Sequence, residues 1–293
     1  MIGVMVADNA GAIVFGNKNF WPEVVGAHKE FFLRIGRLQE AVSSVADRAY
    51  EGVDGYQQLQ ISMLMLTATG MAEIVTLLGN GMGHGAMKIV PGVMENSINA
   101  EYMRQFPDQA DKYLESQWVE QHKLYNHMVY TSPDSLKNFP AEKRAADEAE
   151  YQRVKPLFTH EIQATDGSRQ LVMQDSWRRD NLFQRAEKVN MAGTYRTVIP
   201  SANQILHGSI GSWIRELDEV SRRIEYPPTH KWGGEALIAA HLALLQAVET
   251  CSLSLDTNPT PSLDVLKEDF HVICGDPPMQ EAESQPAPDP SHG

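Results

Sequence analysis

The 293-residue sequence has little cysteine and too few basic residues to balance its acids. Cys251 and Cys274 are its only cysteines, so it has neither a disulfide framework nor a four-cysteine zinc site, and we expect a reducing, cytoplasmic location. Lys and Arg total 25 against 38 Asp and Glu, which gives a formal net charge of −13. Such a surface repels phosphate backbones and anionic headgroups at long range, which disfavours non-specific nucleic-acid binding.

The chain also lacks a persuasive membrane segment. Met1–Phe15 is apolar but has no basic residue and contains Asp8, which argues against a secretory signal. Ile61–Leu78 has about the minimum length for a membrane span. It contains Glu73 and several hydroxyl side chains, with no Lys or Arg close to either end. We therefore expect a buried core helix there and no membrane partner.

Three regions differ in composition and predict the domain organisation. Residues 1–20 hold two β-prone runs around the turn sequence Asp8–Gly11, which indicates a hairpin or an ordered arm. Residues 21–256 form the helical domain, and residues 257–293 are a proline-rich tail that we expect to be largely disordered. The predicted fold is an all-α, multi-helix bundle with a small N-terminal β-hairpin.

Helical periodicity dominates the central region, where apolar side chains recur every three or four positions. The run Gly79–Gly85 should end the second helix with a turn, since it lacks the Gly-Lys-Ser/Thr of a phosphate loop. Gln163–Val172 should form a turn or a short hairpin around Asp166-Gly167. We expect helices at about 22–51, 56–78, 94–106, 108–130, 140–155, 178–192, 195–207, 211–224 and 234–254.

Glu73 is the most informative single residue. It is the only charged residue between Asp54 and Lys88, on a helix whose neighbouring positions are apolar or small. An isolated buried carboxylate either takes up a proton or finds a partner. Because no cation lies nearby in the sequence, we expect the partner to come from another helix.

The segment Tyr195–Ser209 is the expected source of that partner. Asn203 and His207 share one helical face at i, i+4 spacing, and Arg185 and Arg196 belong to a locally basic stretch over residues 178–196. Glu73, His207 and Tyr195 are therefore the candidate catalytic residues. The candidate ligand-binding residues are Arg185, Arg196, Asn203 and Ser209. A buried hydrogen-bond network that only fixes helix register is the alternative interpretation.

Other polar motifs carry less weight. His122 and His127 are five residues apart and fall on different helical faces, so they do not form a metal pair. We name no metal ligands and identify no cofactor. His241, within an apolar helix, is expected to be a core histidine with satisfied hydrogen bonds.

Short segments resemble a widespread bacterial family of helical proteins of unknown function. They are Ala68–Glu73, Trp177–Ala186 and Tyr195…Ser201…His207-Gly208-Ser209, in that order. The resemblance covers roughly residues 30–255 and implies roles for Glu73, Tyr195 and His207. That family is distantly similar to HEPN-type helical domains of prokaryotic defence and toxin systems, a likeness of fold that assigns no reaction.

Three functions remain open. The first is a non-catalytic binding or regulatory protein, linked to bacterial defence or stress, whose partner is unknown and which can form homo-oligomers. The second is a HEPN-like nuclease or other phosphodiester-handling enzyme with His207 as general acid/base and Arg185 or Arg196 stabilising phosphate charge. Nucleic acid would reach it only through the basic segment 178–196. The third is a metal-dependent helical-bundle enzyme that uses Glu73, His207 and His241.

Overall fold

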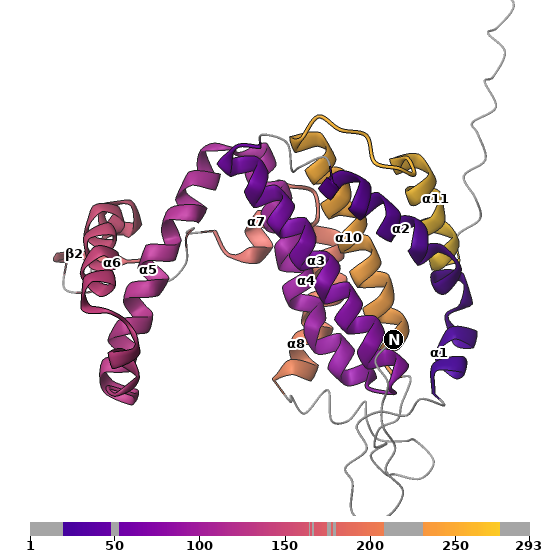
Figure 1. Ribbon diagram of the computed structural model, residues 1–293, viewed down its shortest axis with the longest axis horizontal. Coiled ribbons are helices and arrows are strands. Elements are labelled where there is room, and N and C mark those ends of the chain that lie inside the picture. Colours follow the sequence, from indigo (N-terminus) through magenta and orange to yellow (C-terminus); the bar gives the residue numbers. More distant parts are fainter. Residues whose placement is uncertain are drawn as a thin grey trace, which may run out of the picture.

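The computed structural model describes residues 20–47, 53–163, 165, 167–174, 177, 180–207 and 231–275. These residues form a helical body from which a smaller arm projects (Figure 1). The body contains α1 (Trp21–Ala27), α2 (Lys29–Asp47), α3 (Gly55–Gly79), α4 (Gly83–Gln105), α7 (Leu182–Lys188), α8 (Ala192–Leu206), α10 (Gly233–Ser254) and α11 (Leu263–Cys274). The arm contains α5 (Asp108–Thr131), η2 (Ser135–Asn138), α6 (Ala141–Val154), η3 (Lys155–Phe158), β1 (Thr159–Gln163) and β2 (Arg169–Met173).

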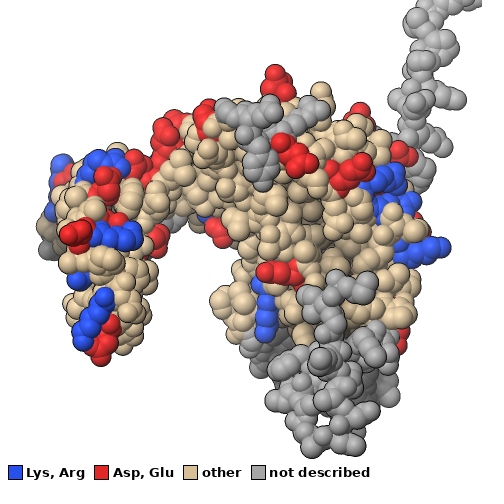
Figure 2. Space-filling view, viewed as in Figure 1, with Lys and Arg blue, Asp and Glu red and all other residues tan. Residues whose placement is uncertain are grey.

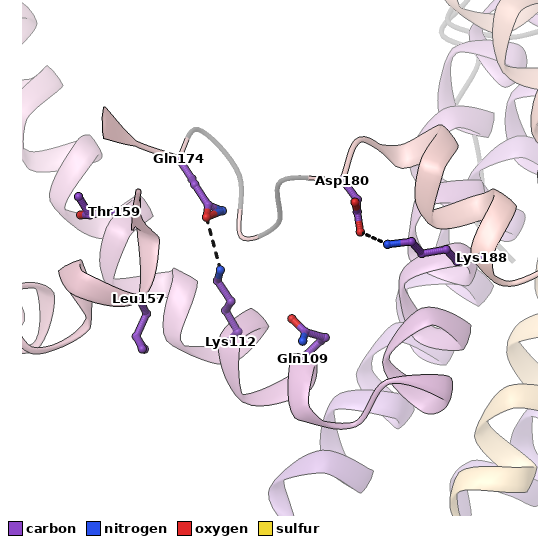
Figure 3. A pocket seen from close by; sticks show the side chains of 7 residues that line it. All are labelled: Gln109, Lys112, Leu157, Thr159, Gln174, Asp180 and Lys188. Carbon is purple, nitrogen blue, oxygen red and sulfur yellow. Dashed lines mark hydrogen bonds and ion pairs between the residues drawn. The ribbon is translucent and has the colours of Figure 1, made fainter. Parts of the chain in front are cut away.

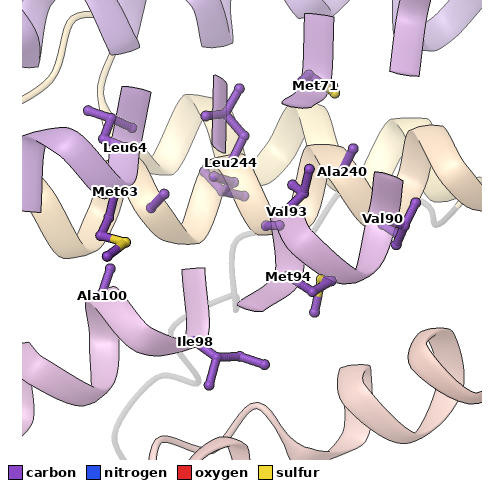
Figure 4. Close-up of a cluster of buried hydrophobic side chains, with 14 of the residues drawn as sticks. Met63, Leu64, Met71, Val90, Val93, Met94, Ile98, Ala100, Ala240 and Leu244 are labelled. Carbon is purple, nitrogen blue, oxygen red and sulfur yellow. The ribbon is translucent and has the colours of Figure 1, made fainter. Parts of the chain in front are cut away.

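Three long apolar helices, α3, α4 and α10, pack on one another and form the centre of the body (Figure 4). Their contact is close because small residues lie where the helices meet. A Cβ atom at Gly70 would stand 2.4 Å from Val93 Cγ2, and α10 contributes a run of buried alanines. Tight interdigitation of this kind gains dispersion energy that a looser core would lose.

A buried carboxylate ties two of these helices together. Glu101 of α4 is 5% exposed and accepts hydrogen bonds from Arg104 and Gln105 on its own helix and from Thr250 of α10, at 2.7–2.8 Å. Burial raises the pKa of Glu101, but these hydrogen bonds outweigh it and the net pKa lies below the ordinary value. The side chain is therefore charged and fully engaged, which fixes the register of α4 against α10.

The C-terminal part of the body corrects one prediction. Residues 263–274, which we assigned to a largely disordered tail, form α11. Its apolar stripe packs on α2 and α10, and the buried Asp269 pairs with Arg34 and Arg37 at 3.4 Å and 2.8 Å. The prolines before Leu263 end the preceding turn rather than exclude a helix. Residues 276–293 lie outside the described part of the chain.

The two-stranded sheet is not where we expected the hairpin of the fold prediction. The described strands, β1 and β2, pair antiparallel in the middle of the chain, with Thr159 opposite Met173 and Gln163 opposite Arg169. They confirm the hairpin alternative for the turn around Asp166-Gly167. The N-terminal hairpin predicted for residues 1–20 lies outside the described residues, apart from Phe20.

Most helix positions agree with the sequence prediction to within a few residues, but the helix expected at about 22–51 is divided into α1 and α2. The helix expected from about residue 94 begins at Gly83, so the glycine-rich run holds only a short turn before α4. Pro91 lies inside that helix. The helix expected at 211–224 lies outside the described residues.

Among the residues that the structure describes, two helices are long and apolar enough to cross a bilayer. They are α3 and α10, and 72% of the apolar window of α10 is buried within the protein against 39% for α3. This is weak evidence for a membrane span, because core helices of soluble proteins have the same length and composition.

The contact between Gly70 and Val93 makes a stability prediction. Gly70→Ala should lower the free energy of unfolding by about 1–3 kcal/mol, because the stiff valine cannot swing away from the added methyl group. Gly36→Ala on α2 is the matched control, since nothing lies within 4 Å of its Cβ position. Alanine there should be neutral or stabilise by up to about 1 kcal/mol. Urea unfolding of both variants measures the difference, and equal effects would contradict the packing described here.

His241 is buried as expected but lacks the expected hydrogen bonds. It is 1% exposed on α10, between the rings of Phe31 and Phe270, and neither ring nitrogen has a partner among the described residues. Burial lowers the pKa of His241 to about 4. The imidazole is therefore neutral at pH 7. It fills space in the core, but its two ring nitrogens are buried without hydrogen bonds.

Replacing this ring should change how stability depends on pH. Between pH 6.5 and about 4 the unfolded chain takes up a proton that folded His241 does not, so the folded state loses stability as the pH falls. The loss is on the order of 3 kcal/mol for a shift of this size. His241→Leu should remove it and raise the melting temperature at pH 7. Thermal melts at several pH values test this, and an unchanged pH slope would refute it.

Candidate functional site

The arm joins the body at an elbow made by two stretches of chain. The first is the turn between α4 and α5, where Pro107 precedes α5 and the helix axis changes direction. The second is the return segment from β2 to α7, residues 174–181, of which Gln174, Trp177, Asp180 and Asn181 are described. Figure 2 shows the molecule hollowed between the arm and the body.

Trp177 anchors the return segment in the elbow. Its ring packs edge-on against Tyr102 of α4 and Tyr113 of α5, with ring centroids 6.1 Å and 5.0 Å apart. The guanidinium carbon of Arg185 lies 5.1 Å from the Trp177 ring centroid. Aromatic pairs and a cation over a ring each add specificity to apolar burial, so this cluster fixes where the arm meets the body.

A first groove, the lysine groove, opens at the elbow with a volume of about 400 Å³. Figure 3 shows the arm side chains facing those of the body across it. Lys112 Nζ lies 3.5 Å from Gln174 Oε1, and Lys188 Nζ lies 2.7 Å from Asp180 Oδ2. Its lining residues are Gln109, Lys112, Leu157, Thr159, Gln174, Asp180 and Lys188.

A second groove, the Trp177 groove, lies between α4 and α5 and has a volume of about 490 Å³. It has no lining residue in common with the lysine groove. Its lining residues are Glu95, Asn96, Asn99, Tyr113, Leu114, Ser116, Gln117, Glu120 and Trp177. Its polar lining groups are carboxylates, amides, a hydroxyl and a phenol, and each carboxylate has a cation partner, Arg185 at 3.6 Å from Glu95 and Lys123 at 3.0 Å from Glu120.

Arg185, a predicted ligand-binding residue, lies behind the Trp177 groove. It is 4% exposed, donates a short hydrogen bond from Nη1 to Asn99 Oδ1 and approaches Glu95 Oε1 to 3.6 Å. A buried charge needs such partners to offset the loss of hydration. The pKa of Tyr113 lies above its ordinary value, because burial and the negative charge of Glu95 raise it more than the positive charge of Arg185 lowers it.

The predicted burial of Glu73 is wrong. Glu73 lies on the exposed face of α3, and no ion pair or hydrogen bond joins it to Tyr195, Arg196 or His207 among the described residues. One face of α3 packs on α4 and α10, whereas Glu73 falls on the exposed side of the helix, where the apolar Met65 and Leu66 are also exposed. Because α3 consists mainly of small and apolar residues, its sequence has too weak a periodicity to show which face is buried. The burial of Glu73 could therefore not be predicted correctly.

The remaining candidate residues are spread along α8. Tyr195 packs against Phe183 with ring centroids 5.4 Å apart, and Arg196 pairs with Glu187 at 3.3 Å. Asn203 is half-buried, and His207 is exposed where the helix ends. Ser209 lies outside the described residues. The helix α8 packs on α4, α7 and α10, whereas Glu73 lies on the exposed face of α3.

The basic segment 178–196 is less basic than its sequence suggests. Lys188 and Arg196 are each paired with an acid of the same segment, and Arg185 is buried. Within the described ranges, no group of three or more His, Cys, Asp or Glu residues is placed to hold a metal ion.

The sequence interpretation overlooked Asn99, Lys112 and Tyr113. These residues lie on α4 and α5, and only the angle between those helices brings them to the grooves. Asn99 gave no distinct signal, because Glu95, Asn96 and Ser97 precede it and make the segment mixed in polarity.

Comparison with known proteins places this architecture in a family. No curated protein and no solved structure matches the chain. A family model described as a family of unknown function (DUF5677) matches residues 60–223, which include the whole arm and the elbow. The match confirms an uncharacterised family and gives no support to a likeness with HEPN-type domains. The chain belongs to DUF5677, a family of unknown function.

Proposed function

We propose that this is a cytoplasmic binding or regulatory protein whose lysine groove holds a small phosphate-bearing molecule. The observation that carries the proposal is the convergence of two ammonium groups, one from the arm and one from the body, on a single groove. Lys112 and Lys188 contribute two positive charges, and Asp180 contributes one negative charge. The lining side chains therefore include two cations and one anion, in a chain of net charge −13.

The remaining lining groups suit the same ligand. Gln109 and Gln174 offer amide N–H donors, and Thr159 offers a hydroxyl. Phosphate oxygens accept hydrogen bonds from ammonium, amide and hydroxyl groups alike. A volume of about 400 Å³ is within the range of small-molecule sites.

The position of the groove suggests a regulatory consequence. Lys112 is held on the arm side by Gln174 and by the Phe158 ring, whose centroid is 5.3 Å from Nζ. Lys188 is held on the body side by Asp180, which also accepts a hydrogen bond from Tyr102. A ligand that contacts both ammonium groups would bind the arm to the body and favour one elbow angle.

Binding is favoured over catalysis because the proposed catalytic groups are dispersed. General acid/base catalysis needs its groups within hydrogen-bonding reach of one substrate. Glu73 and His207 are both exposed and belong to helices with different packing partners. The lysine groove, by contrast, brings charged groups from separate elements to one place.

Calorimetric titration with pyrophosphate tests the proposal. Wild-type protein should bind it, and Lys112→Gln and Lys188→Gln should each weaken binding by about tenfold, since each removes a contact worth on the order of 1 kcal/mol. Higher salt should weaken the wild-type interaction as well.

Lys137→Gln is the control for this titration. Lys137 is an arm lysine that also pairs with a nearby aspartate, at 2.6 Å from Asp134, but it does not line the groove. Its substitution should leave the affinity unchanged. Equal affinities for all four proteins, or no binding by the wild type, would refute the proposed function.

A further inference from the structure

The outward face of α3 is exposed to solvent but almost free of charge. Met65 and Leu66 are 45% and 55% exposed on it, and Glu73 is the only charged residue of the helix. A surface helix normally carries several charged residues on its outer face. Figure 2 shows a broad area without Lys, Arg, Asp or Glu on the front of the body, where α3 lies in Figure 1.

The hydroxyl groups on this face are already bonded within the helix. Ser62, Thr69 and Thr76 each donate a hydrogen bond to the backbone carbonyl four residues earlier, at 2.8 Å. Covering an unpaired hydroxyl would cost free energy, but these donors keep their acceptors when water leaves. The face can therefore be buried in a dry interface.

The exposed positions of α3 are spaced as in the contact seam of two packed helices. They alternate at intervals of three and four residues, which is the repeat of a coiled coil. The positions of this seam are Ser62, Met65, Thr69, Ala72 and Thr76. Since the seam has the same spacing on both sides of Thr69, a second α3 running in the opposite direction can meet it about a twofold axis.

Side-chain size and charge both favour the antiparallel direction. About an axis at Thr69, Leu66 of one copy lies opposite Ala72 of the other, so a large side chain meets a small one. The two Glu73 side chains are then about 12 Å apart along the helix axis, beyond the Debye length of about 8 Å. A parallel pair in register would place Leu66 against Leu66 and Glu73 against Glu73.

The net charge of the chain favours this occupant over a membrane. Two copies of a chain with a net charge of −13 repel each other, and the repulsion is least where uncharged surfaces meet. Helices that lie on a membrane carry Lys and Arg beside their apolar face, whereas α3 has neither.

The area of the face sets the expected affinity. The exposed positions from Gln58 to Thr76 span about 27 Å, and α3 with its neighbour α4 is about 20 Å across. Such a face covers about 500 Å² on each copy, less than the roughly 800 Å² of a standard interface. The resulting dimer should therefore be weak.

We propose that α3 docks antiparallel on α3 of a second copy of this chain, about a twofold axis at Thr69. The dissociation constant should be in the micromolar range. The interface is separate from the proposed phosphate site, because no lining residue of the lysine groove belongs to α3.

Sedimentation equilibrium of the whole chain tests the proposal. From about 1 to 500 μM the wild type should pass from monomer to dimer. Thr69→Lys places two ammonium groups at the axis and should weaken association by at least about tenfold. A monomer at every concentration, or a dimer that Thr69→Lys does not weaken, would refute the interface.

Thr197→Lys is the matched control. Thr197 is exposed on α8, and its hydroxyl also donates to the carbonyl four residues earlier, that of Gly193, at 2.9 Å. The same substitution there should leave association unchanged. An equal loss in both variants would show that added charge, rather than the face of α3, is responsible, and the proposal would be wrong.

Disulfide cross-linking tests the direction of the two helices and does not depend on the lysine variants. The background is Cys274→Ser, because Cys274 is exposed. On oxidation, a mixture of Leu66→Cys and Ala72→Cys chains should give a cross-linked dimer, whereas Leu66→Cys alone should not. Cross-linking of Leu66→Cys with itself would indicate a parallel pair and contradict the assignment.

Phosphatidylcholine vesicles test the competing occupant. The wild type should remain in solution when the vesicles are sedimented. Binding to them that Thr69→Lys abolishes would assign the face of α3 to a membrane and overturn the proposal.

Discussion

The close contact of α3, α4 and α10 is the constraint on which the rest of this structure depends. Gly70 lets α3 approach Val93 of α4, and the buried Glu101 joins α4 to α10 through Thr250. Apolar packing supplies the main stabilisation, while the charged hydrogen bonds restrict the helices to one register. A core of this kind holds α4 rigidly along its length, including the end from which the arm departs.

The rigidity of α4 matters because α4 carries parts of the elbow. Asn99 and Tyr102 lie on its buried last turns, beside the Trp177 cluster. The arm has its own small core around Tyr151, Val154 and Phe158, and the body reaches it through α5 and the return segment. Two grooves lie at this junction, one lined by two lysines and the other by two glutamates.

The helices were largely predictable from the sequence, because apolar periodicity and proline positions mark their limits. The hairpin around Asp166-Gly167 was predictable from its turn residues. The α11 helix was not predicted, because the prolines on either side of it resemble a disordered tail although Leu263, Leu266, Phe270 and Ile273 form a helical apolar stripe.

The candidate site was much less predictable. The structure does contain a buried carboxylate, but it is Glu101 rather than Glu73. Its charge is paired locally with Arg104, three residues along α4, while Thr250, 149 residues away, adds a neutral hydroxyl donor. Glu101 stands among charged and polar neighbours in the sequence, so its burial shows only once α10 covers it. The grooves depend on the angle between α4 and α5, which no local pattern encodes.

Hydrogen exchange of the native protein under increasing urea tests most directly whether a rigid three-helix core carries a separately stabilised arm. The amides of α3, α4 and α10 should exchange only through global unfolding, with a steep dependence on urea. The amides of α6 and β1 should exchange through a smaller opening, with a lower free energy and a shallower dependence. A single free energy and a single urea dependence for both sets would contradict this account.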